Sequence, residues 1–268
     1  MTGQNVIAAL AADGADVDRL VADLPADQWT RPTPAPRWTV AHQVAHLAAT
    51  FRMAAMAAGQ PDAFRQLLAH LNEDFSGNVE RAMAPYLAEE PAVLLRRFRE
   101  ERIAAETALT AVPEGQVVPW LVRPIPAPVL AMAGMMELFG HGQDIADGLG
   151  VTRSHSDRLR YLCEFAVRVW DFGYISRGLA TPEVSLGFDL IAPSGAPWQL
   201  GAADATERIS GPAVDFCLLV TRRRHRDDLA LEATGAVAEG WLDIAQAYRG
   251  PAGEGRRPGQ FSPAASRS

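Results

Sequence analysis

Apolar residues recur every three or four positions through much of the first part of the chain, which is the period of a helix with one buried face. This spacing predicts helices over 5–24, from 39 to about 58, over 90–111 and from about 129 to 149. A broken helical stretch is expected over 62–87, with an irregular centre near 75–77. Thr39 is placed to cap the second helix, and Gly150 is placed to end the last one.

The pattern changes after Gly178, where apolar and polar residues begin to alternate. The alternation over 184–191, a turn at 193–195 and a return at 198–200 predict a hairpin. Further helices are expected over 154–174, 213–224 and 239–248, with a short strand over 229–234. The prediction is therefore a mainly α chain, with a helical domain over 1–150 and a connecting helix plus a small α+β domain over 151–250. Residues 251–268, rich in Gly, Pro, Ser and Arg, are expected to form a disordered or loosely attached tail.

Composition limits the classes of partner. The chain has 268 residues, 48% of them hydrophobic, and a formal net charge of -7, which argues against a nucleic-acid-binding surface. It lacks an apolar run of roughly 20 residues and a basic start followed by an apolar stretch, so neither a membrane span nor a signal peptide is expected. We expect a cytoplasmic protein that acts on a small molecule, with a homodimer as one alternative for its assembly. Cys163 and Cys217 are expected to be buried free thiols.

Four residues could form a metal site. Glu137 and His141 lie one turn apart on a predicted helix, and His42 and His46 lie one turn apart on an earlier one. Such pairs also arise as ordinary helix contacts, and a core histidine with a satisfied hydrogen bond is the simplest alternative for His46. Glu137, however, lies in a very apolar helix, where a carboxylate is costly unless it is paired or bound to a metal.

Three strings in the sequence carry a family resemblance. Two of them are Trp38–Leu47, which begins with Trp-x-Val and ends with His-Leu, and Gly140–Gly150. They resemble the DinB-like superfamily, and within it the mycothiol-dependent maleylpyruvate isomerase-like metal-binding branch. Gly211–Arg222 resembles the sterol-carrier-like second domain of that branch. The resemblance implies a DinB-like four-helix bundle followed by a small α+β domain. It also implies that His46, Glu137 and His141 bind one divalent metal, zinc or another.

The resemblance further implies an activity. Two imidazoles and one carboxylate leave a zinc ion an open position, as in catalytic sites. The implied reaction is the addition of a low-molecular-weight thiol, mycothiol, to an activated cis alkene or electrophile, by an isomerase or an S-transferase. One alternative is a thiol-independent metalloenzyme, such as a hydrolase or a cyclase in a specialised pathway. The other is a non-catalytic protein that binds a metal and a ligand.

Four further residues are assigned to the site by expectation. His42 lies on the same helix face as His46, and we assign it a catalytic role, although it could instead be a ligand or a hydrogen-bond donor to a ligand. The matching position is often acidic in the isomerase branch. The basic run that includes Arg222, Arg223 and Arg224 is usually a solvated face. Because the isomerase reaction needs a cation for a carboxylate or a thiol cofactor, we assign Arg223 a catalytic role, and Arg222 and Arg224 to cofactor binding.

Overall fold

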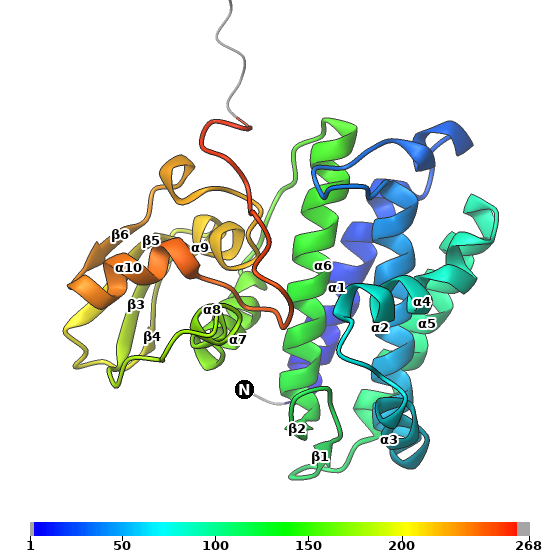
Figure 1. Cartoon of the computed structure of the whole chain (residues 1–268), viewed down its shortest axis with the longest axis horizontal. Coiled ribbons are helices and arrows are strands. Elements are labelled where there is room, and N and C mark those ends of the chain that lie inside the picture. The colour runs from blue at the N-terminus through cyan, green and yellow to red at the C-terminus, as the bar shows by residue number, and fades with distance from the viewer. Residues whose placement is uncertain (1–2, 262–268) are drawn as a thin grey trace, which may run out of the picture. The chain divides into compact units, whose positions relative to one another are not determined.

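The structure is a computed structural model that describes residues 3–261. It divides the chain into two compact units, Met1–Arg153 and Ser154–Ser268 (Figure 1). The division lies close to residue 150, where the helix predicted from about 129 to 149 ends. Each unit has its own core and is described by itself.

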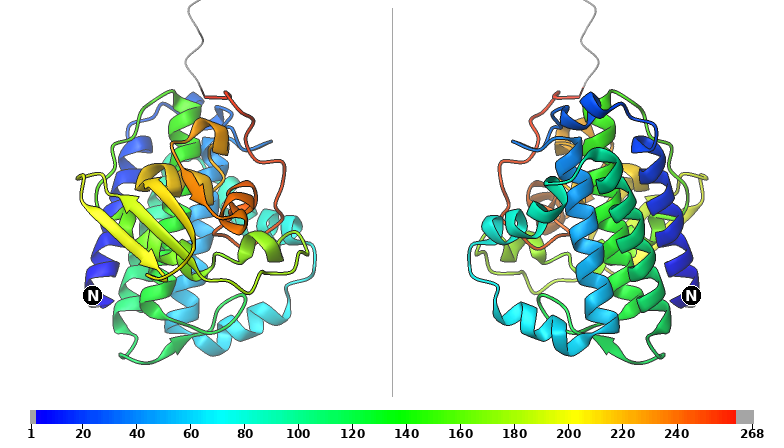
Figure 2. Two further views of the ribbon diagram at one scale, coloured as in Figure 1. Left: turned by 90° about the vertical axis from the view of Figure 1, so that its left-hand side faces the viewer. Right: turned by 90° about the vertical axis from the view of Figure 1, so that its right-hand side faces the viewer.

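Four long helices build the first unit: α1 (Gly3–Val21), α2 (Val40–Gly59), α5 (Pro91–Ala111) and α6 (Ala127–Leu149). Helix α2 packs against both α5 and α6, and α1 packs against the same two helices (Figure 2). Shorter elements connect them: η1 (Ala26–Thr30), α3 (Pro61–Ala69), α4 (Phe75–Leu87) and the antiparallel pair β1 (Val117–Val118) and β2 (Ile125–Pro126). The mainly α, DinB-like fold expected from the sequence is confirmed.

The ends of these helices follow from local chemistry. Thr39 caps α2 in a capping box, in which its side chain accepts from a backbone N–H of the first turn. Gly150 ends α6 in the left-handed region with φ 72°, which costs glycine little. Both predicted caps are confirmed. The broken helical stretch is confirmed, but its break lies over 70–74, a few residues before the expected 75–77. The Asp74 side chain accepts from Gly77 N and starts α4 at Phe75.

Helices α2 and α6 supply much of the core of the first unit. Their fully buried side chains include Val44, Leu47, Leu138 and Ile145. Burying each such side chain contributes about 1.5–3 kcal/mol, so the contact between α2 and α6 is firmly held. In the described part of the chain, no helix is both long and apolar enough to cross a membrane.

Up to residue 261, the second unit contains a mixed sheet and five helical segments. The strands β3 (Leu186–Ile191), β4 (Pro197–Gly201), β5 (Glu207–Pro212) and β6 (Glu232–Thr234) lie in the order β4-β3-β5-β6. The β3–β5 pair is parallel and the other two pairs are antiparallel (Figure 2). The helices are α7 (Leu159–Arg168), α8 (Phe172–Ile175), α9 (Ala213–Val220), η2 (Arg226–Asp228) and α10 (Ala236–Ile244).

Three aromatic side chains form the centre of the second unit. Phe188 of β3, Phe216 of α9 and Trp241 of α10 are all fully buried, with ring centroids 5.4–6.2 Å apart. The indole of Trp241 also donates to Trp170 O over 2.8 Å, so its polar atom is satisfied. The small α+β character expected for this part of the chain is confirmed.

Residues 251–261 form no helix or strand, but they have defined contacts within the second unit. Gly259 N donates to Asp228, Arg222 donates to Gly253 O, and the guanidinium of Arg224 lies 3.8 Å from the Phe261 ring centre. The structure therefore gives residues 251–261 defined contacts, and the expected disorder or loose attachment of the tail stays a prediction. The rest of that predicted tail, 262–268, lies outside the described residues.

Candidate metal centre

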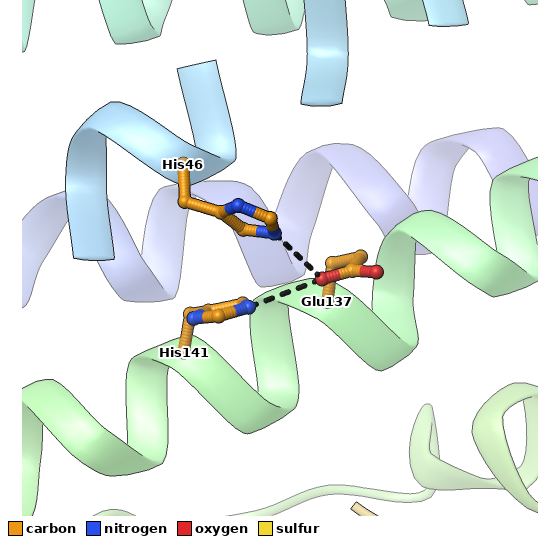
Figure 3. A group of neighbouring side chains, drawn as sticks. All are labelled: His46, Glu137 and His141. Carbon is orange, nitrogen blue, oxygen red and sulfur yellow. Dashed lines mark hydrogen bonds and ion pairs between the residues drawn. The ribbon is translucent and has the colours of Figure 1, made fainter. Parts of the chain in front are cut away.

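The three predicted metal ligands come together between two adjacent helices. His46 projects from α2, while Glu137 and His141 project from successive turns of α6. Figure 3 shows the two imidazoles and the carboxylate pointing toward one another. Burial of the apolar faces of α2 and α6 thus fixes the positions of all three side chains.

The distances between the candidate ligand atoms suit a single small cation. Glu137 Oε2 lies 3.1 Å from His141 Nε2 and 3.4 Å from His46 Nε2, and one ligand atom from each residue lies within 4.8 Å of the others. Donor atoms about 2.0–2.1 Å from a tetrahedral zinc ion are roughly 3.3 Å from one another. Two imidazole nitrogens and one carboxylate oxygen are also donors that catalytic zinc sites use. The residues present therefore fit a divalent metal.

The local electrostatics keep Glu137 in the ligand form. Burial favours the neutral carboxyl and acts to raise its pKa, but hydrogen bonds and charge from His141 and His46 outweigh burial. The net effect holds the pKa of Glu137 well below its usual range. Glu137 is therefore an anion at neutral pH, ready to bind a cation.

Trp38 forms an aromatic wall beside the two histidines. Its ring stacks on His141 with centroids 5.8 Å apart and an interplanar angle of 21°, and it lies 5.3 Å from the His46 ring. The two imidazoles are 4.4 Å apart. The half-buried indole therefore restricts how both rings can turn.

Polar groups lie behind His141, on the side of its ring away from Glu137. His141 Nδ1 is 2.5 Å from Gln43 Oε1, and Gln43 Nε2 donates to Thr33 Oγ1 over 2.8 Å. Thr33 Oγ1 in turn donates to Trp38 O, also over 2.8 Å. Gln43 is completely buried, whereas Thr33 and His141 are half-buried.

The segment that carries Thr33 and Trp38 lies close to α6. A β-bridge between Pro32 and Thr39 closes it into a loop. At Gly148 of α6, an added Cβ would lie only 3.0 Å from Pro32 O and 3.3 Å from Thr33 Cγ2. Glycine at this position allows the loop to approach the helix, and so helps to place Thr33 behind the site.

His42 lies outside the group of candidate ligands. Its Nδ1 is 2.8 Å from Thr39 Oγ1 and 3.3 Å from Thr39 N, where it completes the capping box of α2. Burial lowers the pKa of His42, which favours the neutral ring that accepts these hydrogen bonds. The structure gives His42 a capping contact, and its catalytic role stays a prediction.

The predicted arginines belong to the second unit. Arg223 donates to Thr221 O and Arg224 donates to Arg223 O, while Arg222 takes a positive φ of 57° beyond the end of α9. These contacts belong to the chain turn that follows α9. The assignments of Arg222, Arg223 and Arg224 to catalysis and cofactor binding stay predictions.

Sequence reasoning did not assign Thr33, Trp38 or Gln43 to the site. Gln43 lies three residues before His46, so helical spacing already placed it near the same face. Trp38 stands in the string that carried the family resemblance. Thr33 lies in a proline-rich loop without periodicity, and no sequence signal pointed to it.

Comparison with known families identifies the first unit. The family model described as the mycothiol maleylpyruvate isomerase N-terminal domain matches residues 10–146, a range that contains all three candidate ligands. The chain belongs to this family. Within this maleylpyruvate isomerase family, two relatives from strains of Mycobacterium tuberculosis, the uncharacterized proteins Rv0036c and MT0041, are each 42% identical to it. The matches cover 93% of this chain and 97% of each relative.

Solved structures support the fold of this family member. The crystal structure of the mycothiol-dependent maleylpyruvate isomerase matches with a TM-score of 0.55 and 15% identity, over 82% of this chain and 88% of that one. A histidine-to-alanine variant of that enzyme matches equally well. In the second unit, residues 191–234 match a family model described as wyosine base formation. The expected likeness to a sterol-carrier domain stays a prediction.

Proposed function

We propose that this chain is a metal-dependent enzyme of the maleylpyruvate isomerase type. In this proposal His46, Glu137 and His141 hold one divalent cation, zinc in the first instance. A low-molecular-weight thiol such as mycothiol is the second reactant, and the substrate is a small molecule with an activated alkene or another electrophilic centre. The reaction is an isomerisation or an S-transfer.

The observation that carries the proposal is the three-residue site itself. Its ligand atoms converge on one point, its side chains are only 13–23% exposed, and it lies in the part of the chain that matches the isomerase family. A site with three protein ligands leaves a coordination position open, whereas a purely structural zinc site is usually closed by a fourth ligand. A divalent metal bound there would supply a Lewis acid that keeps a thiol deprotonated near neutral pH.

The residues around the site provide charge and shelter. Glu137 contributes one negative charge and the two imidazoles are neutral when they act as ligands, so the site would keep a net positive charge that attracts a thiolate. Trp38 covers one side of the two imidazoles. The positive charge favours the thiolate over the thiol at the site.

The proposed reaction needs only the thiol and the alkene substrate. The thiolate sulfur forms a bond to one alkene carbon while the π electrons move onto the conjugated carbonyl. Rotation about the resulting single bond, followed by loss of the thiolate, restores the double bond in the trans form. An isomerase thus returns its thiol unchanged. An S-transferase instead keeps the carbon–sulfur bond, the proton lost by the thiol goes to the neighbouring carbon, and one thiol is consumed per product.

Turnover of maleylpyruvate by the full chain, followed with and without zinc and with and without mycothiol, tests the proposal. We expect turnover only when both are present, and loss of at least 100-fold in Glu137→Gln. His70→Ala is the matched control, because His70 caps the end of α3 and contacts Gln66 O rather than the site. Zinc-dependent turnover that needs no thiol would favour a hydrolase or cyclase. Ligand binding that survives metal removal, without turnover, would favour a binding protein.

A further inference from the structure

Three hydrogen bonds connect His141 to a main-chain carbonyl through two buried or half-buried side chains. They run from His141 Nδ1 to Gln43 Oε1, from Gln43 Nε2 to Thr33 Oγ1, and from Thr33 Oγ1 to Trp38 O. The four groups come from α6, from α2 and from the loop before α2. The chain of bonds therefore joins the metal ligand to a part of the fold that contains no ligand.

Each bond in this chain has only one possible direction. The carbonyl of Trp38 can only accept, so the single hydroxyl proton of Thr33 is used there. The oxygen of Thr33 must then accept from Gln43, which turns the NH₂ group of the Gln43 amide toward Thr33. The amide oxygen consequently faces His141, where it can only accept. Nδ1 of His141 must therefore carry the proton that it donates to the Gln43 amide oxygen.

We propose that Gln43 and Thr33 are positioning residues that keep a proton on Nδ1 of His141, so that the neutral ring offers an unprotonated Nε2 to a metal. The inference rests on the metal centre proposed above. If the Gln43 amide faced the other way, its NH₂ group would donate to Nδ1. The proton of a neutral His141 would then lie on Nε2, and that atom could not be a ligand. The Thr33 hydroxyl, tied to Trp38 O, prevents this reversal.

Other metal sites indicate how much metal binding should weaken when the hydrogen bond to His141 Nδ1 is lost. Groups that hydrogen-bond the second nitrogen of a metal-bound histidine fix its ring and raise its basicity, and their loss typically weakens metal binding about 10- to 100-fold. Gln43 is completely buried, so removal of its amide would also leave Nδ1 without its acceptor in a dry environment. We therefore expect Gln43→Leu to weaken metal binding by an amount within this range.

Zinc affinity of the full chain, measured by competition with a chromogenic chelator, is the first test. Gln43→Leu should weaken binding about 10- to 100-fold, whereas Gln43→Glu, which keeps an acceptor facing Nδ1, should stay within a few-fold of wild type. Thr33→Val should weaken binding because the amide can reverse, and Thr33→Ser should restore it. Gln143→Leu is the matched control, since Gln143 is a buried glutamine like Gln43 but lies on α6 and donates to Asp147.

An NMR measurement on the zinc-loaded protein tests the tautomer directly. With ¹⁵N-labelled histidine, wild type should show a His141 Nδ1–H proton that exchanges slowly with water. Gln43→Leu should lose that protection, and Gln143→Leu should keep it. Wild-type affinity and protection in Gln43→Leu would overturn the inference while the metal centre stands, and equal losses in Gln143→Leu would reduce it to a packing effect. A wild type that binds no zinc would overturn the metal centre and the inference together.

Discussion

His42 lies one turn before His46 on α2, yet its Nδ1 contacts Thr39 Oγ1 and Thr39 N at the start of the helix. Glutamate or glutamine usually fills this third position of a capping box, because its side chain must reach back to the N-cap backbone. A neutral imidazole that accepts through Nδ1 can do the same. The difference between the two histidines therefore comes from their distance to the helix end.

This contact predicts separate effects of substitution at His42. His42→Ala should lower the free energy of unfolding by about 1 kcal/mol, since it removes one half of the capping box. His42→Gln should recover most of that loss. Zinc stoichiometry should stay at the wild-type value in both variants. Urea unfolding and elemental analysis check the two parts, and a folded His42→Ala protein without metal would instead make His42 a ligand.

Tyr86 predicts how the stability changes at high pH. It is buried on α4, and its hydroxyl donates to Glu101 Oε1 on α5 over 2.8 Å. Burial and this hydrogen bond raise its pKa to about 12, above the usual value near 10. The unfolded state therefore loses the proton first, so the contribution of Tyr86 to stability is complete below about pH 10 and is lost between about pH 10 and 12.

Denaturant unfolding across this pH range checks the prediction. Tyr86→Phe removes the hydroxyl that donates to Glu101, so the unfolding free energy of this variant should be lower than that of wild type at pH 8. The difference should shrink as the pH rises toward 12. A difference that stays constant from pH 8 to 12 would contradict the role of the Tyr86–Glu101 hydrogen bond.

At the scale of elements, the second unit depends on the close approach of α8 to the end of α10. An added Cβ at Gly173 would lie 2.3 Å from Ile244 O, a backbone atom that cannot move aside alone. Arg177 bridges the two helices at this point, because its guanidinium donates to both Gly173 O and Ile244 O. The two helices are thus joined through backbone atoms.

Two glycine substitutions should have opposite effects on this unit. Gly173→Ala should destabilise it by about 1–3 kcal/mol, the usual cost of overpacking. Gly240→Ala on α10 meets nothing within 4 Å and should stabilise it by about 0.5–1 kcal/mol, because alanine loses less backbone entropy in a helix. Thermal unfolding of the two variants checks the pair. Equal shifts in the same direction would contradict the packing described for α8 and α10.

The elements that the sequence predicts well are those with strong periodicity and clear caps. Helix α5 ends at Ala111 as expected, and α6 ends before Gly150. Strand β5 was missed because Ile209 is its only fully buried apolar side chain, so it has no visible alternation. The single helix expected over 154–174 is in fact α7 and α8, separated by a turn near Val169 that no glycine or proline marks.

At the scale of the whole molecule, two helices far apart in sequence meet to form one candidate metal centre. The Glu137–His141 pair is readable from spacing on one helix, and the family resemblance selected His46 from the other. The hydrogen-bonded groups behind His141 depend on how a proline-rich loop folds against α6, and this is a tertiary contact without a local signal. The sequence therefore predicted the three candidate ligands that the structure brings together, but not the polar groups that lie behind His141.

Metal content of the purified full chain, measured by elemental mass spectrometry, tests the central claim most directly. Wild type should carry about one zinc ion per chain, and His46→Ala, Glu137→Ala and His141→Ala should each lose it while His70→Ala keeps it. The metal should also raise the unfolding temperature of wild type and His70→Ala, and not that of the three ligand variants, since it binds the folded state. A wild type that stays metal-free after reconstitution, or ligand variants that keep their metal while folded, would contradict the three-residue centre.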